Sequence, residues 1–76
     1  MEQETREIEI RRIAPNLRIV YTSECIEELV QGIRSRGQQE PIHVWFVHDS
    51  FRILDGEKRW RALKLLGMKT IRAVIE

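Results

Sequence analysis

The sequence predicts a small α/β (α+β) domain in which a mixed β-sheet of about four strands packs against two main helices. Three patterns indicate this class: an early segment of alternating apolar and charged residues, two stretches with apolar residues at helical spacing, and β-branched runs bounded by turn residues. With 76 residues and a formal net charge of +1, the chain is expected to form one domain, residues 1–76, around a simple core.

The first half of the chain predicts a strand followed by an amphipathic helix. Isoleucines alternate with charged residues over 8–13, and the strand is expected to end near Pro15. Thr22 or Ser23 then offers a helix cap, and a stripe of apolar residues follows at helical spacing. Gly37 is expected to stop this first helix.

The second half predicts a hairpin, a second helix and a last strand. Residues 42–47 and 51–54 are rich in β-branched and aromatic types, and the turn at 48–50 joins them as a hairpin. After the second helix, residues 70–75 are expected to form the final strand. The resulting alternation of strands and helices indicates the α/β class.

The strand-to-helix junction at residues 55–59 is the most informative stretch of the chain. Asp55 is expected to cap the second helix, and Gly56 lets a ligand approach the backbone. The first turn of a helix carries backbone N–H groups without intrahelical partners, and Lys58 and Arg59 add positive charge beside them. This helix start is therefore predicted to bind phosphate.

Arg59 lies on the same stripe of the second helix as Leu63, which must face the core. Because an unpaired guanidinium is costly to bury, we expect Arg59 at the rim of the core, pointing at an anion. Arg61 and Lys64, taken alone, are expected to be ordinary residues of the solvated face.

Composition excludes several classes of protein. Residues 57–72 carry six basic residues against Glu57 alone, which favours a local basic surface but predicts only weak, salt-sensitive binding of duplex DNA. The single Cys25 excludes an internal disulfide, has no expected catalytic role, and matches no usual zinc spacing with His43 and His48.

Other residues favour structural roles and a cytoplasmic protein. Trp45 and Trp60 are expected to pack in the core or at its rim rather than to stack on bases. His43 and His48 are expected to be surface residues. The sequence has no run of apolar residues long enough to span a membrane and no signal segment, so we expect a cytoplasmic location without membrane contact.

Two motifs, in this order, resemble the N-terminal domain of the ParB partition proteins, which has the ParB/sulfiredoxin fold. The first is residues 37–44, in which Gly, Gln and Pro precede an apolar strand. The second is residues 55–62, in which a Gly-Glu-Lys-Arg helix start is followed by Arg-Ala after one residue. The resemblance extends from about Ile8 to Ile75.

The resemblance implies a nucleoside triphosphate with Mg²⁺ between the two motifs: CTP in the ParB branch, ATP in the sulfiredoxin and free serine kinase branches. The implied nucleotide-binding residues come from both motifs and are Gly37, Gln39 or its neighbour Gln38, Pro41, Gly56, Glu57, Lys58, Arg59 and Arg61. Lys58 replaces an Arg of the family and loses its bidentate fork. Glu40 stands where the family more often has Gln, and it either repels a triphosphate or holds its Mg²⁺.

Enzymatic alternatives follow from the same resemblance. Sulfiredoxin activity is not expected, because the helix start lacks the cysteine that this reaction needs. A small ATP-dependent phosphotransferase similar to free serine kinase would draw its base and metal ligands from Glu40, Asp55 and Glu57, with Glu40 and Asp55 as metal candidates. A ParB-like nuclease would need clustered carboxylates, and a nucleoside triphosphatase is a further alternative.

ParB proteins also contain a helix-turn-helix domain and a dimerisation domain, and neither is expected within residues 1–76. The leading hypothesis is a nucleotide-binding module of a DNA-partition or transcription-regulating protein. Such a module would contact DNA weakly or through other domains, and nucleotide would switch its engagement with a second protomer, as in a homodimer. A degenerate fold used only for protein contact is the alternative without nucleotide.

Overall fold

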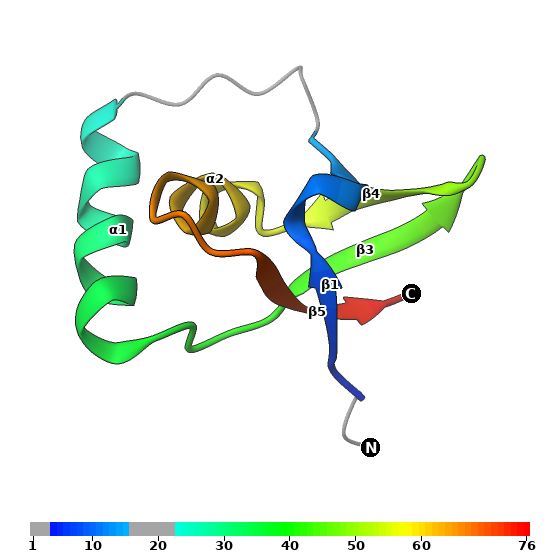
Figure 1. Cartoon of the computed structure of the whole chain (residues 1–76), viewed down its shortest axis with the longest axis horizontal. Helices are drawn as coiled ribbons and strands as arrows, with labels where there is room; N and C mark the ends of the chain where they lie inside the picture. Colours follow the sequence, from blue (N-terminus) through cyan, green and yellow to red (C-terminus); the bar gives the residue numbers. More distant parts are fainter. Residues whose placement is uncertain (1–3, 16–22) are drawn as a thin grey trace.

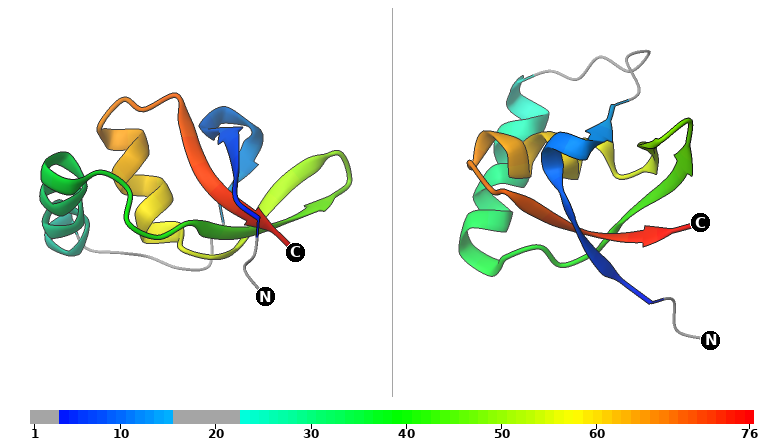
Figure 2. Two further views of the ribbon diagram at one scale, coloured as in Figure 1. Left: turned by 90° about the horizontal axis from the view of Figure 1, so that it is seen from below. Right: turned by 45° about the vertical axis from the view of Figure 1, so that its right-hand side comes forward.

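The computed structural model describes residues 4–15 and 23–76. Along the chain its elements are β1 (Arg6–Glu9), the 3₁₀ turn η1 (Ile10–Arg12), β2 (Ile13–Ala14), α1 (Ser23–Arg36), β3 (Ile42–Val47), β4 (Ser50–Asp55), α2 (Glu57–Leu65) and β5 (Thr70–Ile75). The five strands form one mixed sheet, and α2 lies between α1 and this sheet (Figures 1 and 2). The predicted class and its two main helices are confirmed, with five strands rather than about four.

The additional strand arises because the first predicted strand is broken in two. Ile8 and Ile10 alternate as a strand requires, but Ile10 and Ile13 are three residues apart. In a 3₁₀ turn, residues at i and i+3 lie on the same side, so η1 lets both side chains face the core. The N–H of Ile13 closes this turn by donating to the carbonyl of Ile10.

The sheet is strongly curled, with the strand order β1-β5-β3-β4-β2. β1 pairs antiparallel with β5 and β3 pairs antiparallel with β4, whereas β3–β5 and β2–β4 are parallel pairs. The two edge strands β1 and β2 are separated only by the three residues of η1. The sheet must therefore curl until its edges approach each other, as the second view in Figure 2 shows.

The β3–β4 hairpin extends away from the helices (Figure 1). His48 and Asp49 form its two-residue turn with φ of +50° and +61°, as a type I′ turn requires. The helices do not cover this part of the hairpin, where Trp45 is 45% exposed and Phe46 53% exposed. Of the two expected places for Trp45, the core or its rim, the exposure excludes the core. Trp60, the other tryptophan, is buried as predicted.

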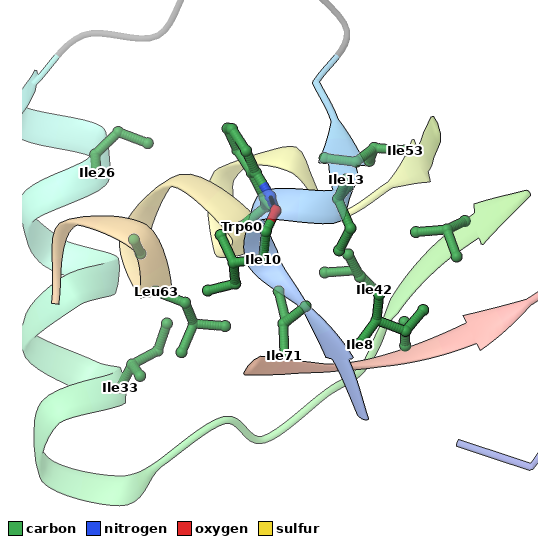
Figure 3. Packing of buried hydrophobic residues seen from close by; sticks show 13 residues of the cluster. Ile8, Ile10, Ile13, Ile26, Ile33, Ile42, Ile53, Trp60, Leu63 and Ile71 are labelled. Atoms are coloured by element: carbon green, nitrogen blue, oxygen red, sulfur yellow. Dashed lines mark hydrogen bonds between the residues drawn. The ribbon is translucent and has the colours of Figure 1, made fainter. Parts of the chain in front are cut away.

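The core lies between the concave face of the sheet and α2, and α1 covers the far side of α2 (Figure 3). Ile42, Val44 and Ile71 are its most deeply buried large side chains. Trp60 packs on η1, where its Nε1–H donates to the carbonyl of Ile10 at 3.4 Å. This contact connects the second helix to the curled end of the sheet.

The predicted extent of the first helix is confirmed. Gly37 ends α1 with φ of +78°, and its N–H donates to the carbonyl of Ile33 at 2.7 Å. The proposed cap at Thr22 and the environment of Cys25 lie outside the described residues. In residues 4–15 and 23–76, no helix is both long enough and apolar enough to cross a membrane.

Candidate functional site

The site is built around the turn between β4 and α2. Gly56 is the N-cap of α2 with φ of +99°, a left-handed conformation that favours glycine. A Cβ atom on Gly56 would lie 2.7 Å from Cγ2 of Ile42, the first residue of β3. The backbone of the helix start therefore packs directly against the strand that follows the first motif.

The prediction that Asp55 caps this helix is wrong. Asp55 is the last residue of β4, opposite His43 in the sheet, and the cap position belongs to Gly56, which has no side chain to offer. The left-handed turn at Gly56 changes the direction of the chain between strand and helix, which places Asp55 one residue too early to act as the cap. Its side chain is exposed.

Arg59 joins the two sequence motifs. Its Nη2 lies 3.1 Å from Oε2 of Glu40, and its Nη1 lies 3.4 Å from the carbonyl oxygen of Pro41. The side chain is 27% exposed, so it lies at the rim of the core as predicted. The anion that it faces in this structure is the carboxylate of Glu40, 19 residues earlier in the chain.

Glu57 and Arg61 form a second pair on a different face of α2. The side chain of Glu57 is 3% exposed, and its Oε2 lies 3.7 Å from Nε of Arg61. A carboxylate in the first turn is also favoured by the positive end of the helix. Arg61 is therefore half-buried against Glu57 rather than the ordinary surface residue that was predicted, whereas Lys58 is exposed.

The two arginines of the second motif do not converge. Residues two apart on a helix are separated by roughly 200° around its axis. Arg59 faces the start of β3, whereas Arg61 lines a cavity of about 840 Å³ between α1 and α2. Ile26 and Val30 of α1 contribute apolar walls to this cavity. The predicted site residues therefore separate into a group around Arg59 and a group around Arg61.

In the first motif, Gln38 has a structural role that the sequence did not reveal. Its Nε2 donates to the carbonyls of Glu40 and Arg72, both at 2.9 Å, and its Oε1 accepts from the N–H of Arg72 at 2.9 Å. The Arg72 guanidinium also donates to the backbone carbonyl of Gln38. Gln38 thereby holds the motif against β5, whereas Gln39 is exposed and donates only locally, to Arg36.

The carboxylates of the site are dispersed among separate partners. Glu40 faces Arg59 and Glu57 faces Arg61, while Glu76 pairs with Nδ1 of His43. Within the part of the chain that the structure describes, no three His, Cys, Asp or Glu side chains gather as a metal site would require. A cation at this site would need most of its ligands from water and from a bound anion.

Comparison with known proteins places this geometry in context. Residues 1–76 match the family model of the ParB N-terminal domain. The chain is 40% identical over 78 residues to a nucleoid occlusion protein of Halalkalibacterium halodurans, and the match covers 99% of this chain and 28% of that protein. The chain thus spans little more than a quarter of the length of this relative.

Solved structures agree with this relation. C-terminally truncated ParB from Caulobacter crescentus, in complex with CTP-γ-S, is similar with a TM-score of 0.86 and 32% identity, over 96% of this chain and 44% of that one. Sulfiredoxin from Arabidopsis thaliana is similar with a TM-score of 0.86 and 29% identity, over 96% of this chain and 84% of that one. The fold is therefore the one that partition proteins and sulfiredoxin share.

Proposed function

The chain belongs to the ParB N-terminal domain family, and from this premise we propose that it is a nucleotide-binding module that holds a nucleoside triphosphate, CTP first of all, at the start of α2. The observation that supports this most strongly is Arg59. A guanidinium at the rim of the core, anchored between the helix start and the first motif, is placed to meet an anion at their junction.

In this proposal three features of the helix start hold the phosphates. The positive end of α2 favours negative charge. The expected approach of a ligand at Gly56 is not part of the proposal, because Ile42 of β3 fills the space where a Cβ of Gly56 would lie. Arg59 donates the stronger, forked hydrogen bonds, and the exposed Lys58 adds a second positive charge. The backbone around Gly37, Gln39 and Pro41 is the proposed neighbour of the base.

Magnesium fits this site only as a companion of the triphosphate. Mg²⁺ commonly keeps several waters and is bound by one or two carboxylates together with phosphate oxygens. The candidates Glu40 and Asp55 are both exposed, which suits that mode of binding and does not suit an all-protein cage. When bound, the cation would neutralise charge on the triphosphate.

The proposed biological role follows from the relatives. A nucleoid occlusion protein and a CTP-complexed partition protein are both similar to this chain. We place the module in a cytoplasmic protein of DNA partition, nucleoid occlusion or transcription regulation, in which bound nucleotide controls engagement with a second protomer. DNA contact would then be weak in this module and would depend mainly on other domains.

Calorimetric titration with the four ribonucleoside triphosphates and Mg²⁺ tests the proposal. We expect the folded chain to bind CTP and Arg59→Ala to bind it roughly 10- to 100-fold more weakly, since a charge-assisted hydrogen bond contributes about 1.5–3 kcal/mol. Arg34→Ala, which changes an exposed arginine near the end of α1, is the matched control and should leave binding unchanged. If the folded chain binds none of the four triphosphates, the proposal is wrong.

The same titration addresses a phosphotransferase. Preference for ATP, with diphosphate released only after a small acceptor is added, would favour the kinase-like alternative over a binding switch. A reaction of the sulfiredoxin type is not proposed, because α2 begins Glu57-Lys58-Arg59 and has no cysteine nucleophile there.

A further inference from the structure

We propose that Glu40 is an internal competitor for the phosphate site: its carboxylate occupies Arg59 when no nucleotide is bound, and a triphosphate binds by displacing it. This inference rests on the proposed function and concerns how the same site is regulated. It begins from the ion pair between Nη2 of Arg59 and Oε2 of Glu40, at 3.1 Å.

The two partners of this pair differ in how firmly they are held. Arg59 is 27% exposed, and a second contact at 3.4 Å from its Nη1 reaches the carbonyl of Pro41. Its Nη1 also lies close to the helix start, because a Cβ on Gly56 would be 3.2 Å away. Glu40, by contrast, is 74% exposed in its side chain.

This asymmetry determines which side chain moves. Arg59 would have to leave a backbone carbonyl and the rim of the core, whereas Glu40 has only to rotate into water. We therefore expect Arg59 to remain in place as a preformed anion site and Glu40 to act as the movable anion. A phosphate oxygen that replaces the carboxylate would find the guanidinium already oriented.

The charges of the two competing anions explain why Glu40 lowers the affinity for nucleotide without preventing nucleotide binding. Carboxylate and phosphate both accept hydrogen bonds from the same fork of Arg59, so they compete for it. A triphosphate carries more negative charge than one carboxylate and gains additional contacts at the helix start. At sufficient concentration it therefore displaces the carboxylate of Glu40 from Arg59. The remaining charge of Glu40 then repels the ligand that has displaced it.

The alternative role for Glu40, ligation of Mg²⁺, predicts the opposite effect of neutralising it. A metal ligand supports binding, so its loss would weaken the nucleotide complex in the presence of Mg²⁺. A competitor opposes binding, so its loss would strengthen the complex with or without the cation. The geometry favours competition, because a guanidinium 3.1 Å from the carboxylate disfavours a second cation there.

Glu40→Gln tests the inference, because it keeps the size of the side chain and removes its charge. We expect this variant to bind CTP roughly three- to fivefold more tightly than the unchanged chain, in Mg²⁺ and in EDTA, and to bind inorganic tripolyphosphate more tightly as well. Tripolyphosphate is informative because a gain that acts through the phosphates does not require a base. Glu28→Gln, an exposed carboxylate on α1, controls for net charge and should change affinity less than twofold.

The outcomes separate the two proposals. Equal or weaker binding by Glu40→Gln, with the unchanged chain binding CTP, would refute the competition and leave the nucleotide site intact. A gain for CTP alone, without a gain for tripolyphosphate, would also refute it. If the unchanged chain and Glu40→Gln are both folded by circular dichroism and neither binds any triphosphate or tripolyphosphate, the proposed function fails and the competition fails with it.

Discussion

Gly56→Ala is the most revealing change at the helix start, because it adds one methyl group at the point where β4, α2 and β3 meet. Two costs arise together. A non-glycine residue at φ of +99° is strained by about 1–2 kcal/mol. The new Cβ would also lie 2.7 Å from Cγ2 of Ile42, which is fully buried and cannot move freely, and overpacking of this kind costs about 1–3 kcal/mol.

The combined cost of backbone strain and overpacking is large for a domain of this size. Lower entropy of the unfolded chain offsets about 0.4–1 kcal/mol for a Gly→Ala change, which leaves a net loss of roughly 1.5–4 kcal/mol. A small single core provides only about 3–5 kcal/mol in total. We therefore expect Gly56→Ala to remove a large part of the stability of the domain and to lower the midpoint of its urea unfolding.

Urea unfolding followed by tryptophan fluorescence measures this loss, since Trp60 is buried and becomes exposed on unfolding. Gly67→Ala is the matched control, because Gly67 has φ of +77° but a Cβ added there would meet nothing within 4 Å. It should lose only the strain of the backbone. Equal losses for Gly56→Ala and Gly67→Ala would show that the close approach of Ile42 carries no energy, and the reasoning would be refuted.

Two further changes test other parts of the structure. Gln38→Ala removes the side chain that holds the first motif to β5 and should lower the free energy of unfolding in urea by about 2 kcal/mol. Gln39→Ala, which loses one exposed hydrogen bond, should lower it by about 0.5 kcal/mol or less. Similar losses for both variants would contradict the role of Gln38. Gly32 lies inside α1, and a Cβ added there would meet nothing within 4 Å. Gly32→Ala should therefore stabilise the chain by roughly 0.5–1 kcal/mol and raise the midpoint of thermal unfolding. A lower midpoint would contradict an uncrowded helical position at residue 32.

Local patterns were sufficient to predict most of the elements. The apolar stripe before Gly37 and the turn residues after Val47 each reflect conformational preferences that act over a few residues. These preferences place α1, the hairpin and β5 at the predicted bounds to within one or two residues. The fold class follows from their order.

Long-range contacts account for what the sequence did not reveal. Whether Ile13 continues a strand or closes a 3₁₀ turn depends on the curl of the whole sheet, and its pairing with Phe51 of β4 is parallel and remote in sequence. The exposure of Trp45 depends on how far the hairpin extends beyond the helices. No periodicity within the strands encodes either feature.

At the site, residue types were predicted more readily than partners. Arg59 was expected to face an anion from its place on the apolar stripe, but its partner Glu40 belongs to another motif. Gln38 and Gln39 are chemically identical neighbours. Only the position of β5 in the fold determines that Gln38, and not Gln39, holds the first motif against this strand. Aspartate commonly caps helices, but Asp55 does not, because the left-handed Gly56 that follows it is the N-cap residue of α2.

The most direct test of the central claim, a triphosphate site at the start of α2, is an NMR titration of backbone amides with CTP and Mg²⁺. We expect the largest shifts at the amides of residues 56–59, with smaller shifts near Pro41 and none at the hairpin turn, His48 and Asp49. The same amides should shift much less in Arg59→Ala at a nucleotide concentration that half-saturates the unchanged chain. Saturable shifts centred on another surface, with residues 56–59 unchanged, would contradict the account.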